Sequence, residues 1–253
     1  MQFQPEIIFE DDELIVLNKP SGMVVNRADT VKDVQTLQDW IEEKFNVQGA
    51  KEKDTQNLIV DGYSKTEEFY NRSGIVHRLD KETSVSILVA KHVPGFINLQ
   101  KQFKTSEVKK VYLALLHGNL VPSEGEINAP IGRLPWNRKR FGVIPSGREA
   151  RTLYKVLSVK KNVEKNEDLS FVEVYPQTGR THQIRVHFQY LNHPIFGDEL
   201  YAGRKVARDD RKILPRHFLH AAIISFNHPS SGLRMNLEAE LSKELKDFLE
   251  KLG

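Results

Sequence analysis

The sequence predicts an α+β fold, a single domain of 253 residues built on a mixed, mostly antiparallel β-sheet. Three observations lead to this prediction. Short apolar stretches bounded by turn residues recur from one end of the chain to the other, as β-strands require. Segments with helical spacing stand between them. No internal repeat or low-complexity linker divides the chain, so one domain covering residues 1–253 is expected.

The first quarter of the chain predicts a β-hairpin followed by a helix. Residues 7–9 and 14–17 are apolar and enclose an acidic turn. The hairpin runs into Asn18-Lys19-Pro20-Ser21-Gly22, whose proline and glycine predict a turn. Residues 47–70 are polar and weakly periodic, which predicts a surface excursion. The helix is indicated by the spacing of Leu37, Trp40, Ile41 and Phe45.

A polar loop between two strands is the next expected feature. Residues 74–76 and 86–90 have the composition of strands, and they flank the polar segment 77–85. Apolar residues within 96–103 fit a helix, and residues 110–116, which are apolar from Val111 on, predict a further strand.

The second half of the chain predicts further strands and two helices. Three apolar residues at i, i+4 and i+7 predict a helix over residues 181–191. A last helix is expected over residues 242–252, with Ser242 as its N-cap. Strands are expected over residues 141–145, 150–159, 171–175, 219–226 and 233–237, with 160–168 as a solvated hairpin tip.

The composition excludes several classes of protein. The chain has no cysteine, which excludes disulfides, thiolate metal sites and cysteine nucleophiles. No apolar run approaches the roughly 18 residues of a membrane span, and the N-terminus lacks the features of a secretory signal. A cytoplasmic protein without membrane contacts is therefore expected. The net charge of +3 is too small to identify a nucleic-acid-binding protein, so the distribution of charge has to decide.

The polar loop carries the side chains that catalysis needs. Residues 77–84 hold an imidazole, a guanidinium, an ammonium, two carboxylates and two hydroxyls. Strands on both sides make such a loop a rigid mount for a catalytic group. A solvated turn is the alternative, and the loop alone does not separate the two interpretations.

Two long motifs resolve this ambiguity. The first is Gly74-Ile75-Val76-His77-Arg78-Leu79-Asp80-Lys81-Glu82-Thr83-Ser84, followed by Ile87-Leu88-Val89-Ala90-Lys91. The second is Gln177-Thr178-Gly179-Arg180-Thr181-His182-Gln183-Ile184-Arg185-Val186-His187, which continues through His193-Pro194-Ile195-Phe196-Gly197-Asp198 to Leu200-Tyr201. Both resemble the signature motifs of the RluA family of RNA pseudouridine synthases, in the family's order. Shorter matches at residues 18–22, 110–114, 219–222 and 226–229 extend the resemblance over nearly the whole chain.

The resemblance implies a pseudouridine synthase fold with a central RNA-binding cleft flanked by helices and loops. It also implies the reaction, in which uracil is detached from C1′ of a uridine in RNA, turned over and rejoined through C5 without a cofactor. Asp80 is then the catalytic carboxylate, Arg185 its charge partner, and Tyr112 the residue that stacks on the target base. Arg78 is implied to fill the gap that the extruded base leaves in the RNA.

Three more residues of the motifs are expected to contact RNA, namely Lys19, His77 and Arg180. The first long motif departs from the family at its end, where glycine is usual and this chain has Val85. Because glycine permits backbone angles that valine resists, this departure bears on the geometry of the loop.

A basic stretch interleaved with aromatic residues lies between residues 133 and 151. Such mixing suits phosphate contacts combined with base stacking, although a run of charge is also typical of a solvated face. A second basic stretch, residues 204–212, is diluted by two aspartates. The RNA contacts expected in the first stretch are Arg133, Arg138, Lys139 and Arg140.

No metal and no small-molecule cofactor is expected. His182, His187 and His193 are separated by five and six residues, a spacing that does not place two ligands on one helix face. We expect these histidines to cap, pack or form hydrogen bonds instead.

Two other functions fit parts of the sequence. An RNA-binding module without catalysis would have lost part of the set Asp80, Tyr112 and Arg185, which is complete. A glycosidase that used Asp80 with Glu82 would need two carboxyl groups at a defined separation, which two residues on one loop do not guarantee.

The expected partner is RNA, either ribosomal RNA or tRNA, and the enzyme is expected to act as a monomer. Many relatives carry an S4 RNA-binding domain ahead of the motif that resembles residues 18–22. Only 17 residues precede Asn18 here, so no S4 domain is expected.

Overall fold

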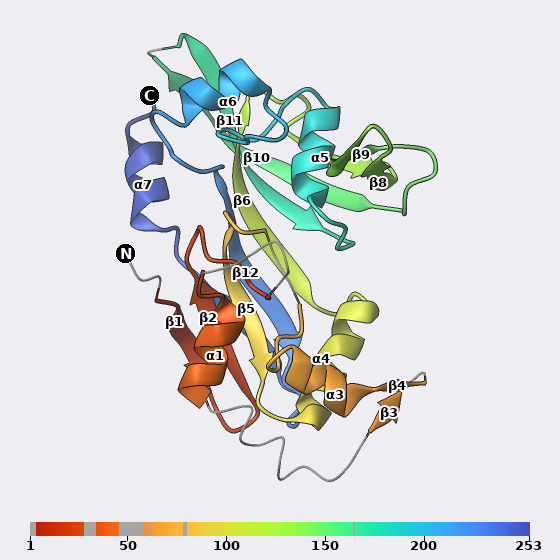
Figure 1. The fold of residues 1–253 in the computed structure, drawn as a ribbon. Coiled ribbons are helices and arrows are strands. Elements are labelled where there is room, and N and C mark those ends of the chain that lie inside the picture. Colours follow the sequence, from red (N-terminus) through yellow and green to blue (C-terminus); the bar gives the residue numbers. More distant parts are fainter. Residues whose placement is uncertain (1–3, 28–33, 46–57, 61, 78–79, 164) are drawn as a thin grey trace. The chain divides into compact units, whose positions relative to one another are not determined.

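The computed structural model describes residues 4–27, 34–45, 58–60, 62–77, 80–163 and 165–253. By its internal contacts the chain divides into two compact units. The first consists of Met1–Val108 with Ile224–Ala239, and the second of Lys109–Ile223 with Glu240–Gly253. Figure 1 shows the elements of both units. Strand β12 (Leu219–Asn227) contributes residues to each of them.

The sheet of the first unit begins with the predicted hairpin, β1 (Glu6–Glu10) and β2 (Leu14–Lys19), which pair antiparallel. Strand β5 (Ser84–Ala90) pairs antiparallel with β2, and β13 (Arg234–Glu238) pairs with β12. Leu14, Ile15, Val16 and Leu17 are all buried, so β2 is covered on both faces. A strand covered on both faces has no solvent-facing side chains, which explains why Leu14–Leu17 is an uninterrupted apolar run.

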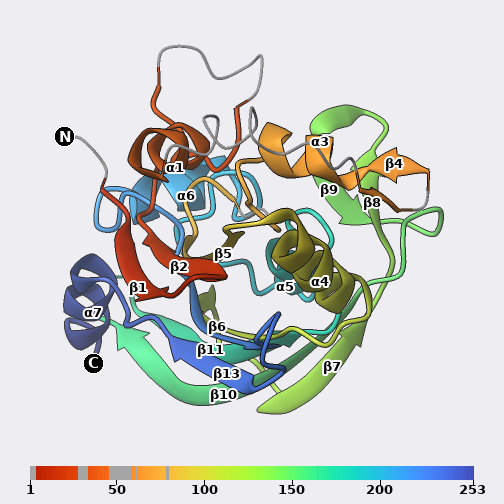
Figure 2. The same cartoon turned by 90° about the horizontal axis from the view of Figure 1, so that it is seen from below.

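The described residues of the first unit form the helices α1 (Leu37–Phe45), α3 (Lys65–Asn71) and α4 (Val93–Lys104). Helix α4 contacts β5, and Figure 2 shows the two together. Helix and strand side chains form one apolar core whose members include Leu14, Val16, Phe69, Leu88, Phe96 and Leu99. The predicted helices over 37–45 and 96–103 are confirmed.

The prediction of a surface excursion over residues 47–70 is wrong at its end. Strands β3 (Ile59–Val60) and β4 (Tyr63–Ser64) pair with each other, and α3 then buries Phe69 and Tyr70. The Ser64 hydroxyl accepts a hydrogen bond from Glu67 N at 3.1 Å and caps α3. A helix of seven residues is too short to show a periodic pattern of apolar residues. The spacing of Ser64 and Glu67, which is typical of a helix N-terminus, was the available signal for α3. Residues 46–57 and 61 lie outside the described residues.

Residues 74–76 do not form the predicted strand. They make one isolated bridge, between Ile75 and Val89. Ser73 and Gly74 turn the chain with φ angles of 49° and 75°. A Cβ atom on Gly74 would lie 2.1 Å from the Ala90 carbonyl oxygen, so no larger residue fits this turn.

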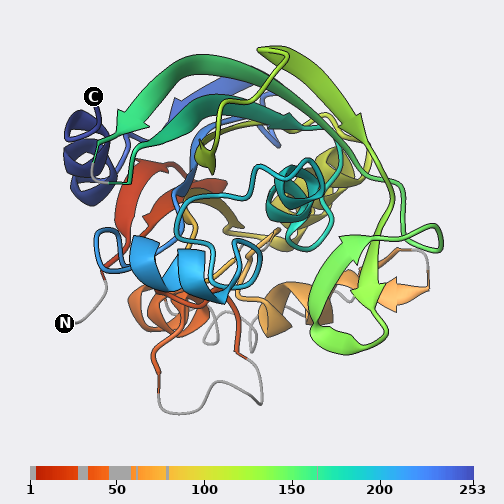
Figure 3. The same cartoon turned by 90° about the horizontal axis from the view of Figure 1, so that it is seen from above.

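The second unit is built on four antiparallel strands in the order β6, β11, β10, β7. Figure 3 shows helix α5 (Gln183–Tyr190) on the concave side of these strands. Helix α7 (Lys243–Glu250) packs Leu245 and Phe248 against Leu115 and Leu169. The strands are β6 (Lys109–His117), β7 (Glu124–Asn128), β10 (Arg151–Asn162) and β11 (Glu167–Pro176).

Three details of the second unit differ from the predictions. The hairpin tip is shorter than 160–168, because β10 and β11 pair as far as Asn162 with Glu167. Ser242 stands at the N-cap of α7, but its side chain makes no capping hydrogen bond. Strand β7, strand β8 (Ile131–Leu134) and helix α6 (Arg204–Asp210) were not predicted, and the strand predicted over 141–145 covers only the end of β9 (Asn137–Val143), which pairs with β8.

The α+β prediction with a mostly antiparallel sheet is confirmed. Within the described part of the chain, no helix is long and apolar enough to cross a membrane. The central RNA-binding cleft stays a prediction.

Candidate active site

The loop that carries Asp80 is held through its backbone by the turn that follows β2. Gly22 N donates to the Lys81 carbonyl oxygen at 2.9 Å, and the Ser21 hydroxyl donates to the Glu82 carbonyl oxygen at 2.7 Å. Within the loop, Thr83 N donates to the Asp80 carbonyl oxygen at 3.2 Å. These bonds fix the main chain on the C-terminal side of Asp80 while its side chain stays partly exposed.

Lys19 lies at the centre of these contacts between residues 19–23 and the loop of Asp80, which we call the clamp. Its side chain is fully buried, and Nζ donates to the carbonyl oxygens of Pro20, Met23 and Lys81, each at 3.0 Å. A buried ammonium is stable only when its donors are satisfied, and here backbone carbonyls satisfy them. The predicted RNA contact of Lys19 does not fit this position. The residue instead ties the first motif to the loop of Asp80.

His77 fixes the loop on its N-terminal side. Its Nε2 accepts a hydrogen bond from Leu88 N at 3.0 Å, and its ring stacks on Phe103 with centroids 4.7 Å apart. An imidazole nitrogen that accepts a backbone N–H is unprotonated, which assigns the neutral ring with its proton on Nδ1. His77 thus joins the loop to β5 and α4, and its predicted RNA contact stays a prediction.

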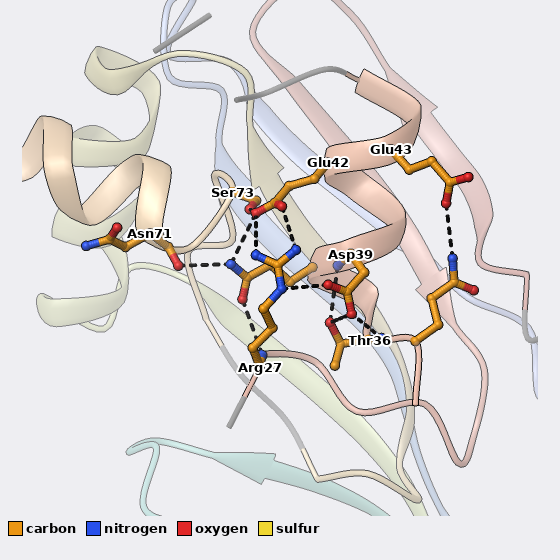
Figure 4. Close-up of polar contacts among 9 residues, drawn as sticks. Arg27, Thr36, Asp39, Glu42, Glu43, Asn71 and Ser73 are labelled. Atoms are coloured by element: carbon orange, nitrogen blue, oxygen red, sulfur yellow. Dashed lines mark hydrogen bonds and ion pairs between the residues drawn. The ribbon is translucent and has the colours of Figure 1, made fainter. Parts of the chain in front are cut away.

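A polar network holds the turn that leads into this loop (Figure 4). Arg27 Nη2 pairs with Glu42 Oε2 at 2.6 Å, and the Ser73 hydroxyl donates to the same carboxylate. Gln38 Nε2 donates to the Asn71 carbonyl oxygen at 3.0 Å. Helix α1 is therefore bonded to the turn before Gly74, and the chain enters the loop from a fixed point.

Val85 occupies a regular strand position. It lies in β5, opposite Lys19 in the register with β2. An extended backbone is the conformation that β-branched residues favour, so valine is compatible with this geometry. The departure from the family pattern falls where the loop has already become a strand. Arg78 and Leu79 lie outside the described residues.

In the second unit, Arg185 forms a buried ion pair with Asp198. Nε donates to Oδ2 at 2.7 Å and Nη2 donates to Oδ1 at 2.9 Å, a bidentate geometry. Asp198 is fully buried and also accepts hydrogen bonds from Leu200 N and Tyr201 N. Burial raises the pKa of the Asp198 carboxyl, but the hydrogen bonds and charge of Arg185 outweigh burial, so this pKa lies below its usual value.

Tyr112 lies in β6 opposite Val174 of β11 and is buried, with 6% of its surface exposed. Tyr112 and Arg185 belong to the second unit, whereas Asp80 belongs to the first. Their predicted meeting at one base stays a prediction.

The three histidines of the second motif form hydrogen bonds, as predicted. His182 Nδ1 bonds to the Tyr201 hydroxyl at 2.8 Å, and His193 Nδ1 bonds to the His117 carbonyl oxygen at 2.8 Å. His187 Nε2 bonds to the Ala129 carbonyl oxygen at 3.0 Å. Burial lowers the pKa of His187, so its ring is neutral at pH 7. Among the described residues, no group of three acidic or histidine side chains could hold a metal ion.

The predicted RNA-contacting residues of the basic stretch lie on the β8–β9 hairpin. Arg138 and Lys139 are exposed, and Trp136 at the hairpin tip has 78% of its surface exposed. Arg133 Nη1 donates to the Arg138 carbonyl oxygen at 2.8 Å, and its guanidinium lies 5.1 Å from the centre of the Phe141 ring. The hairpin therefore presents cations and one large aromatic ring to solvent.

The other two predicted contacts, Arg140 and Arg180, lie closer to the protein body. The Arg140 guanidinium lies 5.3 Å from the centre of the Tyr201 ring. Arg180 is partly exposed, and its Nε donates to the Glu149 carbonyl oxygen at 2.9 Å.

Sequence reasoning missed the roles of Asp198 and Tyr201. Both stand inside the second motif, but a motif gives no partner for a buried side chain. The preference of a buried guanidinium for a carboxylate was the available signal for Asp198.

Comparisons with known proteins agree with these motifs. Residues 13–190 match the family model described as RNA pseudouridylate synthase. An uncharacterized RNA pseudouridine synthase of Helicobacter pylori is 34% identical over 100% of this chain and 71% of its own length. The ribosomal large subunit pseudouridine synthase D of Neisseria meningitidis is 36% identical over 98% of this chain, which spans 61% of that protein. A solved structure, human RNA pseudouridylate synthase domain containing 1, is 26% identical with a TM-score of 0.68, over 95% of this chain and 85% of its own.

Proposed function

This chain belongs to the family of RNA pseudouridylate synthases, and we propose that it isomerises uridine in ribosomal RNA with Asp80 as its catalytic carboxylate. The observation that carries this proposal is the clamped loop. Lys19, Ser21 and Gly22 bond to the backbone immediately after Asp80, which is how a catalytic group is kept in a productive geometry.

The reaction breaks the bond between N1 of uracil and C1′ of ribose, and forms a bond between C5 and C1′. The C5 proton leaves and N1 gains a proton, so the product is an isomer of uridine. A carboxylate can act as the nucleophile or stabilise the cation that forms at C1′. Both roles need the ionised form, which an aspartate with a pKa of about 3.9 has at neutral pH.

Arg185 is proposed as the cation that keeps Asp80 ionised once RNA excludes water. Desolvation raises the pKa of a carboxylate, and a neighbouring guanidinium opposes this. The bidentate pair with Asp198 supports the proposal, since it restricts the rotamers of a long side chain before substrate arrives.

Two residues are proposed to handle the base. Tyr112, on β6, would stack on the uracil during the turnover of the ring. Arg78 would occupy the space of the extruded base with its planar guanidinium; this role is supported by the family resemblance.

RNA binding is assigned to the β8–β9 hairpin and Arg180. Arg138 and Lys139 suit phosphates, and Trp136 suits an unpaired base. Ribosomal RNA of the large subunit is the proposed substrate, because relatives such as the Neisseria meningitidis protein carry that activity in their names.

Mapping pseudouridines in a deletion strain tests the proposal. We expect one or a few uridines of large-subunit ribosomal RNA to lose the modification, and a plasmid with the wild-type gene to restore it. A plasmid encoding Asp80→Asn should not restore it. Loss of pseudouridine in tRNA alone would reject the assignment to ribosomal RNA, and restoration by Asp80→Asn would reject the role of Asp80.

A further inference from the structure

Tyr201 joins three segments of the second unit. Its side chain is buried, with 5% of its surface exposed. Its hydroxyl accepts a hydrogen bond from Phe141 N in β9 at 3.1 Å and bonds to His182 Nδ1 at 2.8 Å. Its own backbone N donates to Asp198 Oδ1 at 3.1 Å. One residue therefore contacts the β8–β9 hairpin, the start of α5 and the partner of Arg185.

The ring of Tyr201 also contacts two cations. The guanidinium carbons of Arg140 and Arg185 lie 5.3 Å and 5.0 Å from its centre, within the range of cation–π attraction. Arg185 has Asp198 as its counter-ion. Within the described part of the chain Arg140 forms no ion pair, and its Nε is a buried donor without a hydrogen-bond partner.

His182 links Tyr201 to helix α5, which carries Arg185. It occupies the N-cap of α5 in the left-handed conformation, with φ of 56°. Arg185 follows three residues later, in the first turn of the same helix. A displacement of the Tyr201 hydroxyl would therefore move His182 and, with it, the first turn of the helix that carries Arg185.

We propose that Tyr201 is a positioning residue that couples RNA binding by the β8–β9 hairpin to the orientation of Arg185. The proposal rests on the function proposed above for Arg140 and Arg185. In the free enzyme, two guanidinium groups lie against one ring, and among the described residues only Arg185 has a counter-ion. An RNA phosphate bound at Arg140 supplies the second negative charge, which offsets the repulsion between the two guanidinium groups and holds Arg140 against the ring. Tyr201 is then held with its hydroxyl bonded to Phe141 N and His182, and these bonds orient the helix that carries Arg185, which couples the two sites.

Single-turnover conversion of an unmodified large-subunit ribosomal RNA transcript separates the chemical step from affinity. Tyr201→Phe keeps the ring and loses the hydroxyl bonds. We expect its rate at saturating RNA to fall about 5- to 20-fold, in the lower part of the range of about 5- to 150-fold that couplings between sites cover, with little change in the dissociation constant. Tyr154→Phe is the matched control, because Tyr154 is a buried tyrosine of β10 outside this network, and its rate should stay at the wild-type value.

Arg140→Met tests the coupling itself. In the wild-type background it should weaken RNA binding and also slow conversion at saturating RNA. In the Tyr201→Phe background it should weaken binding only. A variant that merely loosened the fold would slow conversion equally in both backgrounds, and that result would overturn the proposal. If Tyr201→Phe does not fold, the single variant decides, because an effect of Arg140→Met on affinity alone contradicts coupling.

A spectroscopic measurement makes the result independent of activity. The probe is a single-stranded oligoadenylate RNA, which contains no target uridine. In the wild type, its binding should shift the ¹⁵N signal of Arg185 Nε, and the shift should disappear in both Arg140→Met and Tyr201→Phe. Failure of conversion with the shift present would reject the proposed substrate and retain the coupling. An unchanged Arg185 signal in the wild type would reject the coupling, whatever the activity.

Discussion

Arg185 and Asp198 form a bidentate ion pair inside the second unit, with donor–acceptor distances of 2.7 Å and 2.9 Å. Their side chains have 7% and 0% of their surface exposed. A pair this buried is costly to break from one side, because the remaining charge is left without a partner. The arginine proposed above as the charge partner of Asp80 is thus fixed in place before RNA binds.

Asp198→Asn should lower both stability and activity. The substitution keeps the shape and removes the charge, so the buried guanidinium loses its counter-ion at a cost of about 3–5 kcal/mol. Because the folded-state pKa of Asp198 is lowered, its contribution is present above the unfolded value of about 3.9 and is lost as pH falls through the folded value. Urea titrations should show the deficit at pH 7 and a smaller one at strongly acidic pH. Asp209→Asn, which removes a surface pair with Lys212, is the control and should leave the urea midpoint close to the wild-type value.

His117→Gln should remove a pH dependence of stability. His117 Nδ1 lies 2.8 Å from Glu167 Oε1 and Nε2 lies 2.9 Å from Asp210 Oδ2, so both ring nitrogens donate and the ring is charged. Burial lowers the pKa of His117, but its two carboxylate partners outweigh burial and raise it above its usual value.

The stabilisation from this ion cluster is therefore complete below the unfolded pKa of about 6.5 and is lost as pH rises through the raised folded value. Urea midpoints measured from pH 6 to pH 9 should fall for the wild type. The variant should start lower, by about 3 kcal/mol at pH 6, and change less. Parallel curves for the two proteins would show that His117 is not the titrating group.

Lys19→Met should disorder the loop of Asp80 without removing an RNA contact. Three carbonyl oxygens lose their donor, and each unsatisfied buried group costs about 1–3 kcal/mol. We expect slower conversion at saturating RNA, faster amide exchange at Gly22, and an unchanged salt dependence of RNA binding. Lys91→Met, which removes a surface pair with Glu10, is the matched control and should leave all three unaffected. A reduced salt dependence for Lys19→Met would mean that Lys19 contacts phosphate after all.

Local sequence patterns predicted much of the fold and part of the candidate site. Strand β2 and helix α5 follow from apolar runs and helical spacing. The clamp at Lys19 could not be predicted this way, because Nζ bonds to a carbonyl 62 residues away. Helix α3 was missed because seven residues give no period, and its burial depends on a tertiary contact. The roles of Asp198 and Tyr201 depend likewise on partners that only the folded chain brings together.

Arg138→Gln combined with Lys139→Gln should weaken RNA binding by an electrostatic route. Each lost phosphate contact should reduce the slope of log K against log salt by about 0.7 to 0.9. Conversion at saturating RNA should stay near the wild-type rate, since neither side chain is proposed to touch the base. Lys243→Gln combined with Lys251→Gln removes the same charge from α7 and its C-terminal end, and should leave the slope unchanged. Equal slopes for the two double variants would show that the β8–β9 hairpin does not contact RNA.

The central claim, that Asp80 catalyses isomerisation of uridine in RNA, is tested most directly by nucleoside analysis of purified transcripts. Large-subunit ribosomal RNA is incubated with the wild type, with Asp80→Asn, or with Glu82→Gln from the same loop. The wild type and Glu82→Gln should form stoichiometric pseudouridine, and Asp80→Asn should form none while binding RNA with similar affinity. Pseudouridine formed by Asp80→Asn at the wild-type level would contradict the claim.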